Sequence, residues 1–402
     1  MTRVLLLGSY RQTFVIARAL RGVGYEVLLG SPRPDGFNRV SRAIQGCVGL
    51  PPLTDPIRWI EGLRDALHQD RPISHVFPVG EPELRALAQH PAPLPDGVSL
   101  VAPSADVALT CLDKARINQM AEGLGLPLGR WHSAHDLDEL GRSIDQLGFP
   151  CVVKGNDSRS PLDGEKALIL RSPSDASALW GRLSPFPDSV LVQSFMNGVR
   201  HNCHFVARTG TLVARFEGVV SRTDRADGSG LSVEARSVPL TPELWDFCAR
   251  LCRALEYSGP GMIQFLRTED GSEVGFLEFN PRLAANVGLP VGSGVNLPAL
   301  AVDASAAQRY SAPPDRFAPP STPYRLNTVM SWTLGDLTGI LDERDRLTRS
   351  ELRIRLSRVI TTFLRADMRY SWSFRDPGPT LAMYAGLLRR LMSAAAKRVW
   401  HR

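Results

Sequence analysis

The chain has few residues of the kinds that mark a covalent or metal-based active site. Its six cysteines occur without Cys-x-x-Cys spacing, which excludes the common zinc and redox motifs. Neither a Gly-x-Ser-x-Gly elbow nor a Gly-x-Gly-x-x-Gly turn is present, so the sequence gives no support for a serine hydrolase or a Rossmann dinucleotide site. No apolar run approaches the roughly 20 residues that cross a bilayer, so we expect no transmembrane segment.

Length and composition predict a globular protein with two or three domains. The 402 residues exceed what one core organises, and 43% hydrophobic with 22% charged residues is typical of a folded chain. No secretory signal precedes the first apolar strand, so we expect a cytoplasmic protein. The formal charge is +6, with much of the excess in the last sixty residues. Nucleic acid is therefore not an expected partner, and an anionic small molecule fits better.

The beginning of the chain predicts a β-α-β unit of a parallel sheet. Apolar strands at 4–7 and 25–29 flank a helical pattern at 14–20. Ser9 and Arg11 stand at the entrance of that helix, where an anion could bind. Glu81 follows a later strand at 74–78, so it is a candidate for substrate contact, and the equal alternative is a charge at a helix N-terminus.

Two strands joined by a polar turn carry the most informative residues. The segments 261–266 and 275–282 read as a hairpin, and their alternation places Gln264, Glu278 and Asn280 on one face. Carboxylate and amide oxygens suit Mg²⁺, with Mn²⁺ as an alternative. Arg282 follows directly and suits a phosphate or a carboxylate. The other interpretation is an ordinary amphipathic hairpin with a capping asparagine.

Two lysines lie at the ends of predicted elements. Lys114 falls within a predicted helix at 105–124, and Lys154 ends a predicted strand at 149–154. A lysine at the point where an apolar strand meets a polar loop can contact a phosphate, and the equal alternative is a solvated side chain.

Taken together, Leu112-Asp113-Lys114, Val152-Val153-Lys154-Gly155, Leu191 to Gly198 and Gln264 to Arg282 resemble the ATP-grasp superfamily, in the branch of carbamoyl phosphate synthetase, biotin carboxylase and carboxylate-amine ligases. The resemblance implies mixed α/β and α+β architecture. A pre-ATP-grasp parallel α/β domain would span 1–105 and a two-subdomain ATP-grasp fold 106–310, with the nucleotide-clamping subdomain at about 115–195. A Pro-rich linker and a basic helical extension would follow at 311–402.

The resemblance also implies a role for each site residue. Lys114 and Lys154 would contact the ATP phosphates, and Val192 would hydrogen-bond adenine through its backbone. The metal ligands would be Gln264, Glu278 and Asn280. Arg282 would stabilise the transferring phosphoryl group or hold the acceptor carboxylate.

The chain departs from the superfamily pattern around the nucleotide. Relatives commonly carry a glutamate where Ser194 or His201 stands, and their phosphate-covering loop is rich in glycine. Here that loop has glycine only at its end, so Arg159 is predicted to supply charge in place of backbone amides. Arg222 is a candidate catalytic anion clamp, with a solvated loop charge as the equal alternative.

The expected activity is that of a ligase. ATP and Mg²⁺ would activate a small-molecule carboxylate as an acyl phosphate, which an amine or similar nucleophile would then attack. The alternative is a catalytically weak nucleotide-binding protein that acts as a sensor or assembly component. A homodimer is compatible with the sequence.

The last predicted helix, 381–402, combines leucines with arginines. We favour a helix that packs its apolar side on the core over one that lies on an anionic membrane surface.

Overall fold

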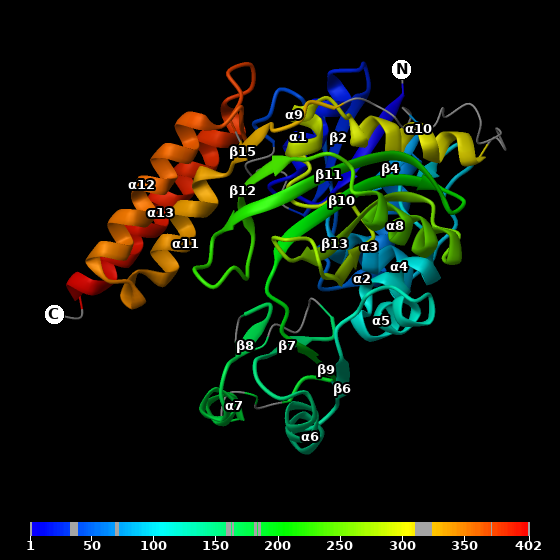
Figure 1. Cartoon of the computed structure of the whole chain (residues 1–402). Coiled ribbons are helices and arrows are strands. Elements are labelled where there is room, and N and C mark those ends of the chain that lie inside the picture. Colours follow the sequence, from blue (N-terminus) through cyan, green and yellow to red (C-terminus); the bar gives the residue numbers. More distant parts are fainter. Residues whose placement is uncertain are drawn as a thin grey trace.

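Three β-sheets organise the chain in a computed structural model that describes residues 2–32, 39–68, 72–157, 162, 165–180, 183, 186–309, 324–370 and 372–400 (Figure 1). The predicted Pro-rich linker at 311–323 and Arg159 lie outside these residues.

The first sheet has five parallel strands in the order β3-β2-β1-β4-β5, as predicted for the opening β-α-β unit. Its strands are β1 (Arg3–Leu7), β2 (Glu26–Ser31), β3 (Gly46–Gly49), β4 (His75–Pro78) and β5 (Ser99–Leu100). Helices connect them, among them α1 (Thr13–Arg21), α2 (Pro56–Leu67) and α3 (Glu81–Gln89). Both faces of β1 are buried, because Leu5 packs towards α2 and Leu6 towards α1.

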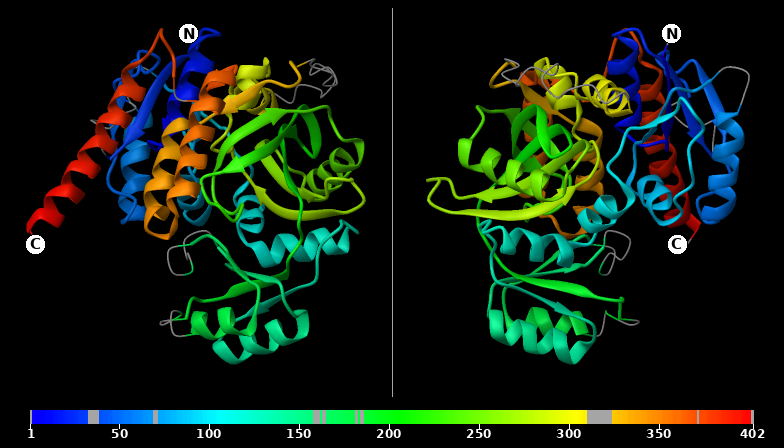
Figure 2. Two further views of the ribbon diagram at one scale, coloured as in Figure 1. Left: turned by 60° about the vertical axis from the view of Figure 1, so that its left-hand side comes forward. Right: turned by 90° about the vertical axis from the view of Figure 1, so that its right-hand side faces the viewer.

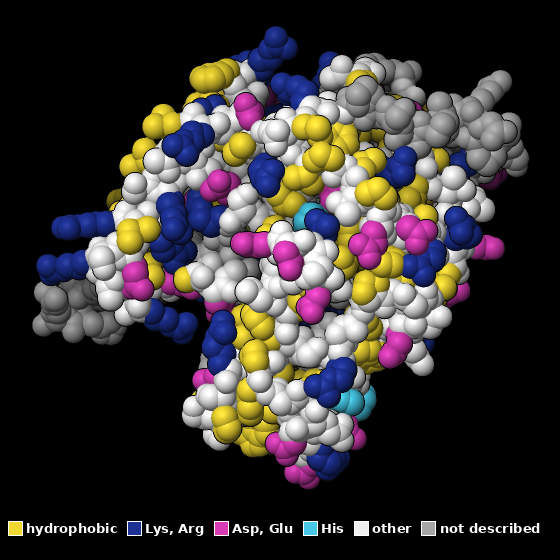
Figure 3. Space-filling model, in the orientation of Figure 1, with side chains coloured by type: hydrophobic (Ala, Val, Ile, Leu, Met, Phe, Trp, Pro, Cys, Tyr) yellow, Lys and Arg dark blue, Asp and Glu magenta, His cyan; other side chains and the backbone are white. Residues whose placement is uncertain are grey.

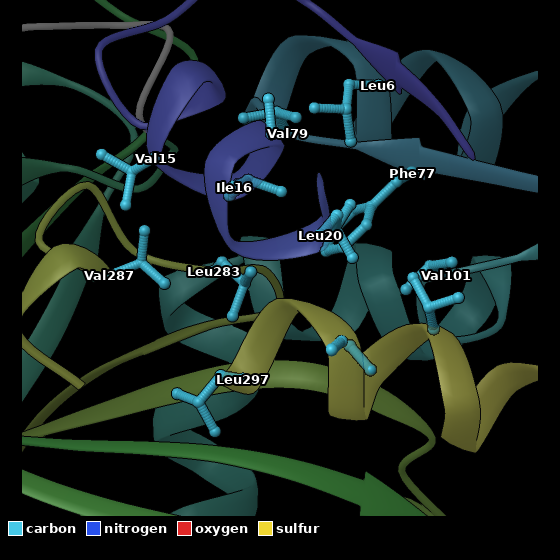
Figure 4. Close-up of a cluster of buried hydrophobic side chains, with 14 of the residues drawn as sticks. Leu6, Val15, Ile16, Leu20, Phe77, Val79, Val101, Leu283, Val287 and Leu297 are labelled. Carbon is cyan, nitrogen blue, oxygen red and sulfur yellow. The ribbon is translucent and has the colours of Figure 1, made fainter. Parts of the chain in front are cut away.

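One hydrophobic core joins this sheet to a distant part of the chain. Leu6 of β1 and Ile16 of α1 pack in the same cluster as Leu283, Val287 and Leu297 (Figure 4). The last three residues follow the predicted hairpin and lead through α9 (Gly288–Ser293) into α10 (Leu297–Arg309). The apolar residues after Arg282 therefore fix that arginine against the N-terminal sheet.

The second sheet is small and antiparallel, in the order β6-β9-β7-β8. Its strands are β6 (Trp131–Ala134), β7 (Cys151–Gly155), β8 (Leu168–Leu170) and β9 (Val190–Ser194). Helices α6 (Leu137–Leu147) and α7 (Pro173–Trp180) cover the face that points away from the rest of the molecule (Figures 1 and 2). The opposite face points towards the third sheet.

The third sheet has seven strands in the order β14-β13-β10-β11-β12-β15-β16. They are β10 (Val199–Arg208), β11 (Thr211–Thr223), β12 (Ser232–Ser237), β13 (Gly259–Arg267), β14 (Val274–Asn280), β15 (Val329–Ser331) and β16 (Met368–Arg369). Helix α8 (Pro242–Ala254) packs on β10 and β11. Strands β15 and β16 come from beyond the prolines, so the C-terminal region adds two short strands to this sheet besides the helices expected there.

The predicted helix at 105–124 is interrupted at Asp113. It forms two helices, α4 (Ala105–Leu112) and α5 (Lys114–Gly123). The Asp113 carboxylate accepts a 3.0 Å hydrogen bond from the backbone N–H of Arg116 and thereby caps α5. Because this local bond competes with a continuous helix, Lys114 becomes the first residue of α5.

The C-terminal region forms a group of helices beside the first sheet (Figure 1). They are α11 (Thr333–Glu343), α12 (Arg349–Arg365) and α13 (Gly378–Trp400). Met383 of α13 packs against the core cluster, whereas Leu381, Leu388 and Met392 are 57, 60 and 71% exposed, so the expected packing on the core holds for only part of the described apolar residues of this helix. Figure 3 shows apolar and basic side chains next to one another over these helices. Among the described helices, none is long and apolar enough to cross a membrane.

Candidate functional site

The β13–β14 hairpin brings the three predicted metal ligands together. Gln264 lies opposite Glu278, and Asn280 lies two residues further along the same face of β14. The Asn280 amide nitrogen donates a 2.7 Å hydrogen bond to Oε1 of Glu278. The Gln264 amide nitrogen donates at 2.8 Å to Oδ1 of Asn202, its neighbour on β10.

These hydrogen bonds leave oxygen atoms for a metal ion. The amide nitrogens of Gln264 and Asn280 are engaged, which turns their oxygens away from these partners. Among the described residues, none donates a hydrogen bond to Oε1 of Gln264, Oδ1 of Asn280 or Oε2 of Glu278. A set of one carboxylate and two amide oxygens fits Mg²⁺, which completes its coordination with water and phosphate oxygens. No cluster of three His, Cys, Asp or Glu side chains suited to a metal occurs in the part of the chain that the structure describes. Nucleotide phosphates would have to supply the remaining negative charge.

Lys154 points from the small sheet towards this hairpin. Val153 packs under the helices of the small sheet, so alternation turns Lys154 to the opposite face. Its ammonium donates to Oε1 of Gln193 at 3.1 Å and to the Leu277 carbonyl at 3.4 Å. The side chain is only 7% exposed, so the alternative of a solvated lysine is wrong. Burial, with help from the Lys114 charge, lowers the pKa of Lys154 to about 8.

Lys114 reaches the same region from the start of α5. Its ammonium donates to the carbonyl of Gly155 at 2.7 Å and of Asn156 at 3.3 Å. The Asn156 side chain accepts from the Ala115 N–H and donates to Asp113, which binds the end of β7 to the start of α5. Burial lowers the pKa of Lys114, and the nearby Glu278 carboxylate opposes that shift.

Glu278 is the carboxylate on which the charges of the surrounding lysines act. Burial alone would raise its pKa, but the hydrogen bond from Asn280 and the charges of Lys114, Lys154 and Lys166 lower it below its usual range. Glu278 is therefore an ionised carboxylate near three ammonium groups. The structure thus brings together both predicted phosphate-binding lysines and the predicted metal ligands.

Two further cations belong to the site, and the sequence analysis missed them. Lys166 is exposed, yet neighbouring groups partly desolvate it and lower its pKa, while the Glu278 charge opposes this effect. Arg200 on β10 lies near Glu278 as well and donates to the carbonyls of Gly228 and Gly230 at 2.8 and 3.1 Å. Alternation with Asn202 on one strand face could have revealed Arg200, whereas no local pattern marks Lys166.

Arg282 lies at the junction of the hairpin and the N-terminal sheet. One guanidinium nitrogen donates to the Leu283 carbonyl at 3.3 Å, and the buried Nε has no partner. The Arg282 charge acts on Tyr10 and Glu83, whose side chains share a 2.8 Å hydrogen bond. Gly8 permits this arrangement, because a Cβ atom there would lie 2.4 Å from the Tyr10 ring and φ is +94°.

Glu81 fits the alternative of a charge at a helix N-terminus. It begins α3 and accepts a 3.0 Å hydrogen bond from Arg85 one turn later. The Glu81 charge raises the pKa of Lys114, so Glu81 lies near the cluster of Lys114 and Glu278.

Arg222 occupies neither of the environments expected for it. It lies on β11, opposite Glu234, and pairs with Glu234 at 3.3 Å and with both oxygens of Asp336. Asp336 comes from α11, and its side chain is 3% exposed. The expectation of a loop charge is therefore wrong, and this guanidinium has no free edge comparable to that of Arg282.

Val192 lies in the middle of the small sheet. Strand β9 has β6 on one side and β7 on the other, where Val192 faces His132 and Val153. The backbone groups of a residue between two paired strands form the hydrogen bonds of the sheet, so the backbone of Val192 is not available to hydrogen-bond adenine. Phe195, Met196 and Asn197 follow β9 and connect it to β10 outside regular strand pairing.

Sequence comparison finds similarity over less than half of the chain. A family model described as "ATP-grasp in the biosynthetic pathway with Ter operon" matches residues 187–330. Formate-dependent phosphoribosylglycinamide formyltransferase of Burkholderia mallei (strain SAVP1) is 30% identical over 182 residues, which cover 44% of this chain and 41% of that enzyme. The matched part therefore spans less than half the length of that curated relative.

Structural comparison extends the similarity to most of the chain. The ADP complex of N5-carboxyaminoimidazole ribonucleotide synthetase superposes with a TM-score of 0.63 at 15% identity, covering 86% of this chain and 85% of that one. The biotin carboxylase domain of Hydrogenobacter thermophilus 2-oxoglutarate carboxylase, solved with MgADP and bicarbonate, gives 0.61 at 16% identity, with coverages of 82% and 73%. At these identities the likeness concerns the fold.

Proposed function

The chain belongs to the ATP-grasp superfamily, and we propose that it is an ATP- and Mg²⁺-dependent ligase. It activates a carboxylate as an acyl phosphate and transfers the acyl group to an amine or a similar nucleophile, releasing ADP and phosphate. One observation carries this proposal: Lys114 and Lys154, from two separate elements, converge with Glu278 of the hairpin. Such a pairing of buried cations with a metal-type carboxylate suits a magnesium triphosphate.

The lysines position and neutralise the triphosphate. Lys154 is buried and Lys114 half-buried, and the pKa of each is lowered because the protein desolvates the ammonium group without full compensation. A polyanion at this point supplies the missing counter-charge. Arg159, outside the described residues, would add a further positive charge to the covering loop.

Gln264, Glu278 and Asn280 would hold Mg²⁺ through their unengaged oxygen atoms. When bound, the ion would neutralise charge on the phosphate oxygens. Asn202 and the Glu278–Asn280 hydrogen bond fix the orientation of the two amides, so the oxygens are preorganised for this role.

The acceptor carboxylate would lie between Arg282 and Lys166. Its oxygen attacks the γ-phosphorus, the bond to ADP breaks, and an acyl phosphate forms. The nucleophile then attacks the carbonyl carbon, inorganic phosphate leaves, and the nucleophile loses a proton. Arg282 and Lys166 stabilise the negative charge on the reacting oxygens. Because two carboxylates already pair with Arg222, we withdraw its catalytic role and assign it to positioning the C-terminal region.

Adenine would contact the connection after β9 in place of Val192. Residues 195–197 join the two sheets that enclose the phosphate site, and Asn197 is exposed. The backbone N–H of Phe195 donates to the Pro150 carbonyl at 3.2 Å. The backbone groups of Met196 and Asn197 lie outside regular strand pairing, so these two residues can recognise a base edge.

The second candidate is a nucleotide-binding protein without turnover. It is favoured by His201, which stands where relatives carry an acidic contact and whose ring nitrogen lies 2.8 Å from Oε1 of the buried Glu217. Glu217 also accepts from Thr241 and Trp245. This histidine is therefore held by the core and does not replace a ribose-binding carboxylate.

Positional isotope exchange separates the two candidates. ATP labelled with ¹⁸O at the β,γ-bridge is incubated with the protein, Mg²⁺ and a panel of carboxylic acids without any nucleophile. A ligase scrambles the bridge oxygen in the presence of its acceptor, because acyl phosphate formation is reversible. Thermal stabilisation by Mg-ATP without exchange or phosphate release across the panel would support the sensor.

A further inference from the structure

The C-terminal region contributes two aromatic rings to the acceptor side of the site. The Arg11 guanidinium carbon lies 3.6 Å from the ring centroid of Trp332 and 5.8 Å from that of Tyr370. Arg11 precedes α1 in the first sheet, whereas Trp332 follows β15 and Tyr370 follows β16. Residues more than 300 positions apart therefore form one cation–aromatic cluster.

This cluster contains buried hydrogen-bond donors for which the described residues provide no acceptor. Arg11 makes no hydrogen bond or ion pair with any residue that the structure describes. Trp332 Nε1 and Tyr370 Oη are buried and unpartnered, as is Nε of Arg282 nearby. The Tyr370 side chain is 3% exposed, so water does not readily replace a missing partner. An unsatisfied set made up of donors fits a negatively charged acceptor.

The charges around Arg11 do not neutralise it. Burial lowers the pKa of Arg11, the Arg282 charge lowers it further, and Tyr370 and Asp224 oppose the shift. The Asp224 carboxylate is already engaged, since it accepts a 2.7 Å hydrogen bond from the Leu231 N–H. A desolvated guanidinium with so little compensation is stabilised when an anion enters.

The Arg11 charge acts on Lys166, one of the two residues proposed to bind the reacting carboxylate. The Glu278 charge raises the pKa of Lys166, and the charges of Arg282 and Arg11 lower it, so all three lie within electrostatic reach of this lysine. One carboxylate placed between Lys166 and Arg282 uses those two cations and leaves Arg11 without a counter-charge. A second anionic group on the same molecule would satisfy it.

The segment that carries the two rings is held firmly in place. The Tyr370 N–H donates to the Ser331 carbonyl at 2.7 Å. Beyond it, Asp376 accepts from Arg18 at 2.8 Å and from the Ser41 hydroxyl at 2.6 Å. The cluster is thus preorganised by bonds between the C-terminal region and the first sheet.

We infer that Arg11, held over the ring of Trp332, binds a second anionic group of the acceptor. The acceptor then carries a phosphate or a further carboxylate in addition to the carboxylate that reacts. This inference rests on the proposed function, because it takes Arg282 and Lys166 as the site of the reacting carboxylate.

Calorimetric titration with inorganic phosphate and with malonate tests the inference at low ionic strength. Saturating Mg²⁺ and a non-hydrolysable ATP analogue occupy the triphosphate site beforehand, so the added anion reports on the acceptor side. We expect saturable binding of at least one anion, weakened tenfold or more in Arg11→Gln and restored towards the wild-type value in Arg11→Lys. A preference for phosphate or for malonate distinguishes the two kinds of second group.

The control Arg58→Gln removes an arginine whose side chain is 78% exposed, and it should bind both anions like the wild type. Unchanged anion binding in Arg11→Gln, or no binding of either anion by the wild type, would overturn the inference. Affinity for the ATP analogue is measured in the same samples. If the wild type does not bind the ATP analogue, the result counts against the proposed function instead. The failure of the inference and the failure of the proposed function are therefore distinguishable.

Discussion

The Lys154 ammonium lies 3.4 Å from the backbone carbonyl of Leu277, the residue that precedes Glu278. A lysine of the small sheet therefore touches the strand of the large sheet that carries the metal-type carboxylate. This contact crosses the boundary between two separately folded sheets. A bound triphosphate would lie at that boundary, and closure of one sheet on the other would exclude water from it.

Glu278→Gln should abolish Mg²⁺-dependent nucleotide binding while leaving the fold intact. The substitution keeps the shape and the hydrogen bond with Asn280 but removes the only carboxylate of the proposed ligand set. We expect nucleotide affinity to fall at least tenfold and turnover at least a hundredfold, in line with the loss of a metal ligand. Calorimetry with and without Mg²⁺ measures the first effect. The matched control is Glu273→Gln, an exposed residue in the same hairpin; equal losses in both variants would refute the assignment.

Nucleotide affinity should decrease as the pH rises above about 8. In the free protein Lys154 has a pKa of about 8, and contact with phosphates favours its protonated form. Below that pH the lysine is already charged, so affinity is flat. Above it, binding requires uptake of a proton, and affinity falls by up to about tenfold per pH unit. Titrations in buffers of different ionisation enthalpy measure the proton directly. Lys154→Arg should remove the pH dependence of nucleotide affinity. If the dependence persists in this variant, a group other than Lys154 takes up the proton.

Lys154→Met should stabilise the nucleotide-free protein. Depression of the pKa from 10.5 to about 8 means that keeping this lysine charged at pH 7 costs about 3 kcal/mol of stability. Hydrogen bonds to Gln193 and Leu277 recover part of this, so we expect unfolding to shift upward by about 1–3 °C. The cost is complete below the folded pKa and disappears as the pH rises towards 10.5. The advantage of methionine should shrink over that interval, and a lower melting temperature at pH 7 would contradict this prediction.

Loss of Asp336 should affect stability and leave the chemistry unchanged. Asp336→Asn leaves the Arg222 guanidinium buried with only Glu234 as a charged partner. Breaking one side of a buried pair costs about 3–5 kcal/mol, whereas replacing both sides with apolar residues is often near neutral. Chemical denaturation should therefore show a large loss for Asp336→Asn and recovery in Arg222→Met combined with Asp336→Leu. If that double variant folds normally but does not turn over, Arg222 has the catalytic role that we withdrew.

Local patterns predicted the hairpin and the first β-α-β unit well. Gln264, Glu278 and Asn280 share one face because strand alternation depends only on neighbouring residues. The same reasoning could not show that Lys114 and Lys154 meet, since their encounter depends on the packing of α5 against the end of β7. The resemblance to a superfamily supplied that information.

Long-range pairing accounts for most of what the sequence analysis missed. Arg222 was predicted to be an anion clamp, with a solvated loop charge as the equal alternative, because its partner Asp336 lies 114 residues away on a helix. Strands β15 and β16 are too short for an alternation pattern, so only the pairing of β15 with β12 and of β16 with β15 reveals them. Asp113 broke the predicted helix because its side-chain cap competes with continuous helical bonding.

Calorimetric titration with a non-hydrolysable ATP analogue tests the central claim most directly. We predict one nucleotide per chain, a requirement for Mg²⁺, and loss of binding in Glu278→Gln and in Lys114→Met. Heat that is absent in the wild type, or that persists unchanged in both variants, would show that these residues do not enclose a magnesium triphosphate.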